Sequence, residues 1–140
     1  MIAAIHIESR STIPSWIGNI ERTCFGEAWS SMCENEHIWA IPFVGFARWK
    51  LAASIQEAEL LRIGVANNSR RNGYGRAILQ YSQSQIANLG INHLFLEVRV
   101  SNVAARSLYQ SEGWVCMSLR SHYYCDGEDA MNYQFCGTAL

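Results

Sequence analysis

The chain lacks the features of several protein classes. It has only two prolines, and charged residues make up 16% of its 140 positions against 49% hydrophobic residues, so it does not resemble a disordered or linker segment. No apolar run approaches the ~20 residues that cross a bilayer, and the first positions carry polar side chains where a signal peptide has an apolar core. We therefore expect one globular domain over residues 1–140, located in the cytoplasm.

An excess of charge of one sign is also missing. The 11 Lys and Arg residues nearly balance the 12 Asp and Glu residues, which leaves a formal net charge of −1. A general affinity for nucleic acid or for an anionic membrane requires a clustered excess of basic residues. The composition therefore predicts neither a nucleic-acid partner nor a membrane partner.

Sequence signatures of metal sites and disulfides are absent as well. The five cysteines form no C-x-x-C pair and do not group with the four histidines along the chain. An odd number of cysteines at irregular spacing is typical of reduced thiols. We expect no metal site and no cysteine nucleophile.

Seven segments have the alternation or the β-branched and aromatic content of strands. We expect them over Ile2–Ile7, His37–Phe43, Val44–Ala53, Ala58–Val65, His93–Val100, Trp114–Leu119 and Ala130–Cys136. Pro42 is expected in the turn between the second and the third, and the last two are expected to pair antiparallel.

Four segments have helix signals. The first is expected to be capped by Ser11 or Thr12, to carry Pro14 near its start, and to bury Trp16, Ile17, Ile20 and Phe25. The others are expected over Ser30–Glu36, over Gly73–Leu89 ended by Gly90, and over Val103–Glu112, capped by Ser101 or Asn102 and ended by Gly113. Helices combined with these strands predict an α/β or α+β fold, a mixed and mostly antiparallel sheet flanked by helices.

The segment Arg70-Arg71-Asn72-Gly73-Tyr74-Gly75 lies between a predicted strand and a predicted helix. The N–H groups of a first helical turn lack partners, and the helix dipole adds partial positive charge there. Gly73 and Gly75 have no Cβ, so a diphosphate could approach the main chain closely, and Arg76 adds a further positive charge. The segment therefore predicts a binding site for a phosphorylated ligand.

Two common phosphate motifs do not fit this segment. A P-loop requires a Gly-Lys pair, which occurs nowhere in the chain, and a dinucleotide fingerprint requires a third glycine where Ile78 stands. The pattern that remains is R-x-x-G-x-G.

A second group of residues surrounds Glu97. Strand alternation places Glu97 on the face opposite the apolar set Leu94, Leu96, Val98 and Val100, together with Phe95 and Arg99. A carboxylate in so apolar a strand costs stability unless it is paired, so one interpretation is an ion pair of Glu97 with Arg99 or Arg62. Tyr109, in the next predicted helix, would by itself be interpreted as a core aromatic.

The order of these residues resembles a known family. R-x-x-G-x-G is similar to the pyrophosphate loop of the GNAT acetyltransferases, and their late motif is similar to Leu96-Glu97-Val98-Arg99-x-Ser101-Asn102-x-Ala104-Ala105-x-x-Leu108-Tyr109-x-x-x-Gly113-Trp114. The tail that contains Tyr123-Tyr124 and Asp126-Gly127-Glu128-Asp129-Ala130 is typical of N-terminal acetyltransferases. From about Val44 to Phe135, the chain resembles the RimI-like protein N-terminal acetyltransferases within the GNAT superfamily.

The resemblance implies a function and a set of site residues. It implies acetyl-CoA as co-substrate and a protein N-terminus as acceptor, in particular the N-terminal alanine of a small-subunit ribosomal protein. It implies Glu97 as general base, Tyr109 as general acid, and Tyr123 and Tyr124 as lining of the peptide groove. The implied cofactor-binding residues are Ile63, Gly64, Val65, Arg70, Arg71, Asn72, Gly73, Tyr74, Gly75, Arg76 and Asn102.

Other interpretations remain at this stage. The Val65 N–H is a candidate donor to the oxyanion of the reaction. A GNAT enzyme that acetylates lysine or a small amine would share the loop and the cofactor, and a catalytically silent acyl-CoA-binding module would share the fold. The presence of both Glu97 and Tyr109 favours an active enzyme over the silent module.

Overall fold

Seven strands form one mixed sheet in the order β1-β2-β3-β4-β5-β7-β6. The computed structural model describes residues 4–9 and 11–137. The strands are β1 (Ile5–Glu8), β2 (Glu36–Ile41), β3 (Gly45–Ala52), β4 (Glu57–Val65), β5 (His93–Arg99), β6 (Val115–Arg120) and β7 (Ala130–Cys136). Neighbouring strands pair antiparallel except β4 and β5, which are parallel. The expected mixed, mostly antiparallel sheet is confirmed.

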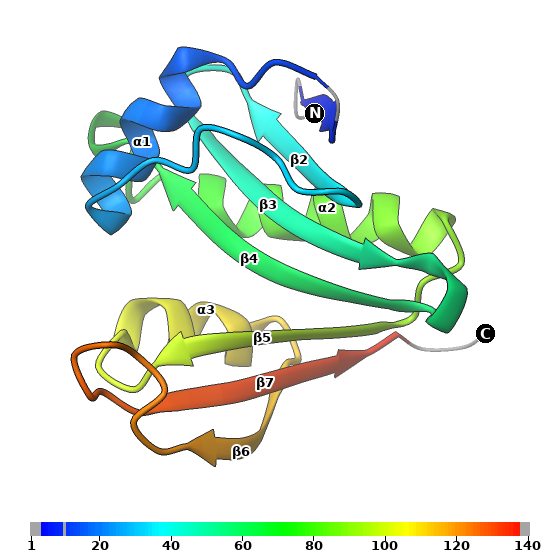
Figure 1. Ribbon diagram of the computed structural model, residues 1–140, viewed down its shortest axis with the longest axis vertical. Coiled ribbons are helices and arrows are strands. Elements are labelled where there is room, and N and C mark those ends of the chain that lie inside the picture. The colour runs from blue at the N-terminus through cyan, green and yellow to red at the C-terminus, as the bar shows by residue number, and fades with distance from the viewer. Residues whose placement is uncertain (1–3, 10, 138–140) are drawn as a thin grey trace.

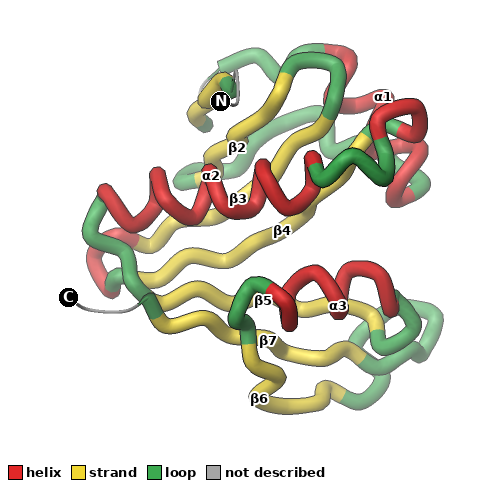
Figure 2. Tube along the Cα trace, turned by 180° about the vertical axis from the view of Figure 1, so that it is seen from behind, coloured by secondary structure: helices red, strands yellow, loops and turns green. Residues whose placement is uncertain are grey.

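Helices cover both faces of the sheet. α1 (Ser15–Phe25) lies on one face, while α2 (Tyr74–Asn88) and α3 (Val103–Ser111) lie on the other, as Figures 1 and 2 show from opposite sides. Burial of large apolar side chains, worth roughly 1.5–3 kcal/mol each, holds these layers together. The α1 side buries Ile17, Ile20, Ile38 and Phe46, and the other side buries Trp49, Leu60, Leu79, Ile86, Leu96 and Tyr133. In the described part of the chain, no helix has the length and apolar character of a membrane span.

Local sequence signals place most element ends correctly. Gly90 and Gly113 follow α2 and α3 with φ angles of +83° and +91°, as expected of glycines after a helix. The Asn102 side chain accepts a hydrogen bond of 3.2 Å from the Ala105 N–H and is the N-cap of α3. Pro42 lies in the turn between β2 and β3, as predicted.

α1 differs from its prediction at both ends. Pro14 occupies the N-cap position and no side chain caps the helix, so the predicted cap by Ser11 or Thr12 is wrong. The Ser11 N–H instead closes a turn onto the Glu8 carbonyl. Phe25, predicted to be buried, is 40% exposed: it is the last residue of α1 and lies outside the hydrophobic core, with its ring centroid 4.6 Å from Arg62 Cζ.

The predicted helix over Ser30–Glu36 does not form. The segment is a loop, and Glu36 is already the first residue of β2. The Glu36 carboxylate accepts hydrogen bonds of 2.7 Å from the Cys33 N–H and from Arg48 Nε, so a tertiary ion pair fixes the chain there. The first predicted strand is also displaced: β1 starts at Ile5 and extends to Glu8, and residues 1–3 lie outside the described residues.

β4 and β5 pair over a short stretch and then separate. Only Glu57–Glu59 pair with His93–Phe95, and Figure 1 shows the two strands diverging beyond this point. Between β3 and β4 the register shifts, so that Leu61 has no partner on β3. Such a bulge bends and twists a strand, which accounts for the divergence. The second half of β4 therefore has β3 on one side and no strand on the other.

The end of β4 that borders this separation is packed closely against β3. A Cβ on Gly45 would lie 2.7 Å from the Gly64 carbonyl oxygen and 2.9 Å from Ile78 Cδ1. We expect Gly45→Ala to lower the free energy of unfolding by roughly 1–3 kcal/mol through overpacking. Urea unfolding of the purified protein measures this change.

Gly18→Ala is the matched control, because its Cβ would lie 3.5 Å from Ala28 Cβ, an ordinary van der Waals contact. Because Gly18 lies inside helix α1, where alanine is favoured over glycine, the substitution should raise the free energy of unfolding by about 0.5–1 kcal/mol. Equal effects of the two substitutions would contradict the close approach at Gly45.

Candidate active site

The glycine loop opens helix α2 in the way its sequence predicts. Gly73 is the N-cap with a φ of +77°, and the first helical hydrogen bond runs from the Ala77 N–H to the Gly73 carbonyl. A Cβ at Gly73 would meet no atom within 4 Å, and one at Gly75 would have its nearest neighbour at 3.7 Å. The loop is therefore uncrowded at both glycines, and the N–H groups of the first turn have no intrahelical partners, as a diphosphate site requires.

The three arginines of this loop are not equivalent. Arg70 Nε donates to the Val65 carbonyl at 3.1 Å, and the Arg76 guanidinium pairs with Glu112. Arg71 is exposed, has a φ of +66°, and makes no side-chain hydrogen bond or ion pair within the described residues. Arg71 is therefore the arginine whose charge is available to a ligand.

The second half of β4 presents peptide groups to the side where β5 has diverged. The Ala66 N–H donates to the Val44 carbonyl at 2.8 Å, and Gly64 stands opposite Phe46 in the antiparallel register. Since N–H groups alternate along a strand, those of Ile63 and Val65 point away from β3. An extended ligand could pair with this edge as an added strand does. The Asn102 carboxamide oxygen, by contrast, is already engaged in capping α3.

Glu97 lies at the diverging end of β5 and is nearly buried. Its side chain is 9% exposed, and its Oε1 atom is 3.0 Å from Asn132 Nδ2 and 3.0 Å from Arg120 Nε. The Oε2 atom is buried and has no hydrogen-bond partner among the described residues. An unpaired buried carboxylate oxygen is costly, which makes this atom a candidate acceptor for a ligand or a water molecule.

The predicted ion-pair partners of Glu97 are wrong. Arg99 pairs instead with Asp126 and Glu128, at 2.8 and 3.0 Å, and Arg62 pairs with Glu21. The actual partner, Arg120, comes from β6, which the order of the sheet places two strands from β5.

Tyr109 lies on α3 within the core on the other face of the sheet. It is 5% exposed, with ring centroids 5.8 Å from Trp114 and 6.2 Å from Tyr133. Burial, with a smaller contribution from a negative charge on Tyr124, raises the pKa of the Tyr109 hydroxyl far above its usual value. The hydroxyl therefore stays protonated and is able to donate a hydrogen bond.

The tail between β6 and β7 lies beside Glu97. The Arg99 guanidinium lies 4.0 Å from the Tyr124 ring centroid and 2.8 Å from Asp126. Burial raises the pKa of Tyr124, and the negative charge of Glu97 is among the further causes. Tyr123 packs edge-on against Tyr124 and is exposed. Both tyrosines thus stand near the candidate base, while Asp126 is engaged with Arg99 and does not face a groove as a free anion.

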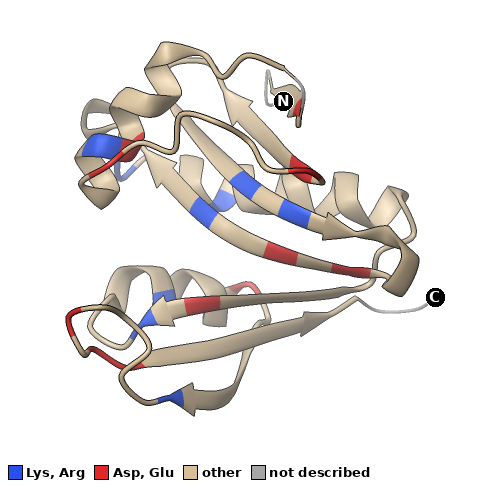
Figure 3. Ribbon diagram, in the orientation of Figure 1, with Lys and Arg blue, Asp and Glu red and all other residues tan. Residues whose placement is uncertain are grey.

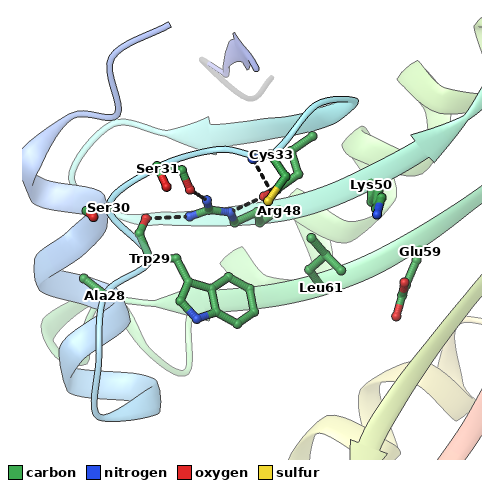
Figure 4. A pocket seen from close by; sticks show the side chains of 10 residues that line it. Ala28, Trp29, Ser30, Ser31, Cys33, Arg48, Lys50, Glu59 and Leu61 are labelled. Carbon is green, nitrogen blue, oxygen red and sulfur yellow. Dashed lines mark hydrogen bonds and ion pairs between the residues drawn. The ribbon is translucent and has the colours of Figure 1, made fainter. Parts of the chain in front are cut away.

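A pocket of about 580 Å³ lies on the α1 side of β3 and β4. Figure 4 shows Trp29 near α1 and Lys50 and Glu59 at the far end, on neighbouring strands where they are register partners. Burial raises the pKa of Glu59, and the negative charge of Glu97 raises it further. Glu59, which lines the pocket, and Glu97, the candidate base, are therefore close enough for their charges to interact.

Buried ion pairs fix the loop that forms the wall of this pocket. Glu21 is fully buried, and its Oε2 atom is 3.0 Å from Arg62 and 3.4 Å from Arg48. The Arg48 guanidinium also donates to the carbonyls of Trp29 and Ser31, as Figure 4 shows. Figure 3 shows that β3 carries basic residues and that β4, beside it, carries both basic and acidic residues.

These pocket residues were missed by sequence reasoning, although a signal was present. Arg48 and Arg62 stand in the middle of β3 and β4, each between two apolar neighbours. A charged residue in such a strand needs a partner, so the two arginines predict buried ion pairs. The partner Glu21 could not be identified, because it lies 41 positions before Arg62 on a helix.

Comparisons with known proteins agree with this arrangement. The family model described as "Acetyltransferase (GNAT) family" matches residues 6–114. The chain is 34% identical, over 92% of its own length and 86% of the relative's, to the [ribosomal protein bS18]-alanine N-acetyltransferase of Escherichia coli K12. It is 38% identical over 61% of its length to an N-alpha-acetyltransferase of Sulfurisphaera tokodaii, and it covers 53% of that protein.

Solved structures lead to the same fold. The crystal structure of the ribosomal-protein-S18-alanine N-acetyltransferase from Escherichia coli superposes with a TM-score of 0.77 at 27% identity, covering 98% of this chain and 96% of that one. Ard1 from Thermoplasma volcanium reaches a TM-score of 0.76 at 22% identity, covering 99% of this chain and all of that one. The chain belongs to the GNAT family of acetyltransferases. It is an N-acetyltransferase, which confirms the expectation from the loop and the late motif.

Glu21→Gln tests the ion pairs behind the pocket. The substitution keeps the shape of the side chain but leaves Arg62 as a buried charge without a close carboxylate. We expect the free energy of unfolding to fall by about 3–5 kcal/mol, the usual cost of breaking a buried pair. Glu27→Gln is the control, since its carboxylate is 4.0 Å from Arg62 and 74% exposed, and it should cost less than about 1 kcal/mol. A loss at Glu21 no larger than that at Glu27 would show that the network is dispensable.

Glu59→Gln tests the raised pKa of Glu59, which burial causes first and the negative charge of Glu97 second. A carboxyl whose pKa is raised binds more protons in the folded than in the unfolded protein, so stability falls as pH rises through that window. The substitution removes this loss, so the variant should melt at a higher temperature than the parent at pH 7, with the difference disappearing near pH 4. Exposed Glu34→Gln should change stability by less than about 0.5 kcal/mol at either pH. A variant less stable than the parent at pH 7 would argue for a structural pairing of Glu59.

Proposed function

We propose that this protein transfers the acetyl group of acetyl-CoA to the α-amino group of a protein N-terminus, with the N-terminal alanine of a small-subunit ribosomal protein as the first substrate to test. The unpaired, buried Oε2 of Glu97 is the observation that carries the proposal. The relative of known substrate, 34% identical over 92% of the chain, supports this choice of acceptor. The proposal includes one domain over residues 1–140 acting in the cytoplasm, which the five free cysteines support.

The proposed cofactor site joins the α2 start to the edge of β4. The open N–H groups at Gly73–Arg76 and the charge of Arg71 would hold the pyrophosphate, while Ile63–Val65 would pair with the pantetheine arm. Arg70 and Asn72 would hold the loop in shape, because Arg70 donates to the Val65 carbonyl at the end of β4 and Asn72 donates to carbonyls of the loop itself. Asn102 would lie beside the cofactor at the start of α3. When bound, acetyl-CoA supplies an activated thioester.

Glu97 is proposed as the base that prepares the acceptor amine. A free α-amine has a pKa of about 7.7–8.0, so roughly a tenth of it is already neutral at pH 7. The Oε2 atom can accept a hydrogen bond from this amine, directly or through one water, and so orient its lone pair and take up its proton. The Asn132 amide and the Arg120 guanidinium hold the other oxygen in place.

The oxyanion that develops on the thioester carbonyl requires fixed donors. The N–H groups of Ile63 and Val65 both point toward the side where β5 has diverged, so we propose Val65 as donor and Ile63 as the second candidate. A rigid backbone donor loses little entropy at the moment of reaction.

Tyr109 is proposed to assist departure of the thiolate. Even at ordinary pKa values of about 10 for tyrosine and 8.5 for a thiol, full proton transfer would cost about 2 kcal/mol. Burial raises the pKa of Tyr109 further, so the transfer becomes more costly still. The hydroxyl therefore serves best as a strong hydrogen-bond donor to the sulfur.

The acceptor would approach over the pocket on the α1 side. Glu59 and Glu97 together place negative potential where a cationic N-terminus would enter. Tyr123 and Tyr124 would contact the peptide from the opposite side, beside Arg99.

Mass spectrometry of peptides incubated with the protein and acetyl-CoA tests the proposed function. The panel contains free N-terminal Ala, Ser and Met peptides and one blocked peptide that offers only lysine. We expect acetyl on the α-amine, with the Ala peptide modified fastest. Acetylation of lysine alone would overturn the acceptor but keep the cofactor, and absence of any transfer would favour a silent CoA-binding module.

Glu97→Gln tests the role of the base. We expect kcat to fall by about 10²–10⁴-fold, the usual contribution of general base catalysis, while affinity for acetyl-CoA stays within about twofold. Arg71→Ala should show the reverse pattern, a raised KM for acetyl-CoA with kcat little changed. Steady-state kinetics and calorimetric titration with CoA measure the two effects. Loss of CoA binding together with kcat in Glu97→Gln would make the carboxylate a structural residue.

A further inference from the structure

Two histidines and a glutamate meet at the outer edge of the sheet, remote from β4 and β5. β1 is an edge strand that pairs with β2 alone, and in this register Glu8 stands opposite His37 while His6 stands opposite Trp39. Since side chains alternate along a strand, His6, Glu8 and His37 project from the same face. None of the three takes part in the acetyltransferase site described above.

The three side chains are close enough to share one ion. His6 Nε2 lies 2.9 Å from His37 Nδ1, and one ligand atom from each of the three residues lies within 4.8 Å of the others. Tetrahedral zinc with bonds of about 2.0–2.1 Å separates its ligand atoms by roughly 3.3 Å. The two nitrogens therefore need to open by about 0.4 Å and exchange the hydrogen bond that joins them for the metal, and the exposed Glu8 carboxylate needs to move inward.

Aromatic contacts hold the two imidazoles in position. The His6 ring is stacked on Trp39 with centroids 4.5 Å apart and an angle of 4° between the planes, and Trp39 itself is buried. The His37 ring lies 5.7 Å from the same indole at 15°. Positioned ligands lose less conformational entropy on binding than mobile ones.

The protonation state also suits metal binding. Burial lowers the pKa of both His6 and His37, and the neighbouring His6 lowers that of His37 further, against an opposing effect of Glu8. Both rings are therefore neutral near pH 7, and neutral imidazole is the form that binds a metal.

We propose that His6, Glu8 and His37 bind one divalent transition metal, zinc in the first place, which joins the edge strand β1 to β2. Two imidazoles and one carboxylate are an established zinc donor set that leaves a fourth position for water. Calcium and magnesium prefer all-oxygen ligands and do not match this site. The chain at β1 leads within a few residues into α1, so the metal would stabilise the start of the fold.

Titration of the metal-free, full-length protein with zinc chloride by calorimetry tests the site. We expect one equivalent to bind and to raise the melting temperature, because a ligand that binds only the folded state stabilises it. His37→Ala should weaken binding at least about 100-fold, since loss of even a supporting partner of a ligand costs roughly 10–100-fold. Exposed Glu8→Gln should weaken it by about tenfold or more and is expected to fold normally.

His93→Ala is the matched control. Its imidazole lies 3.2 Å from the Glu57 carboxylate, so it belongs to a second histidine–carboxylate pair that lacks the second imidazole. Zinc affinity should be unchanged in this variant. Cobalt replacing zinc should give the intense visible absorption of a tetrahedral site, and that band should disappear in Glu8→Gln.

Three outcomes would overturn the proposal: no saturable zinc site tighter than about 100 µM, unchanged affinity in His37→Ala and Glu8→Gln, or loss of binding in His93→Ala. If circular dichroism shows that His37→Ala does not fold, the Glu8→Gln titration decides the question. Since metal binding is measured without substrate, a negative result leaves the proposed acetyl transfer untouched, and absence of acetyl transfer leaves the metal site untouched.

Discussion

The short pairing of β4 with β5 is the constraint on which the rest of the site depends. The unpaired Leu61 bends β4 away after Glu59, and the peptide groups of Ile63 and Val65 then face a side without a strand. A continuous parallel sheet would have used those peptide groups in its own hydrogen-bond ladder. One extra residue in a strand thus provides an edge of unpaired peptide groups to which an extended ligand can bind.

Buried charge provides the second part of the site. Glu21, Arg48 and Arg62 lie between α1 and the sheet, where a purely apolar set would have stabilised the fold at least as well. Directional hydrogen bonds from Arg48 to loop carbonyls fix the segment that carries Trp29 over the pocket, which apolar contacts could not do. Removing one of these three charges is therefore expected to disturb the whole loop that forms the pocket wall rather than a single contact.

Sequence patterns were reliable where the physical cause is local. The glycines after α2 and α3, the Asn102 cap and the glycine loop depend on neighbouring backbone, and they occur where predicted. The helix predicted over Ser30–Glu36 failed because Glu36 is fixed by Arg48, a residue from another strand. The burial predicted for Phe25 is also wrong, since the last residue of α1 lies outside the core, where its ring packs on the Arg62 guanidinium.

The sequence by itself determined the family, the mixed sheet and the positions of Glu97 and Tyr109 within their elements, because periodicity and motif spacing are properties of neighbouring residues. Only the tertiary structure decided which charges meet. It paired Glu97 with Arg120, turned Arg70 and Arg76 toward the protein, and brought His6 within 2.9 Å of a histidine 31 positions away. Contacts of this kind depend on strand order and register, which are set by the packing of the whole chain.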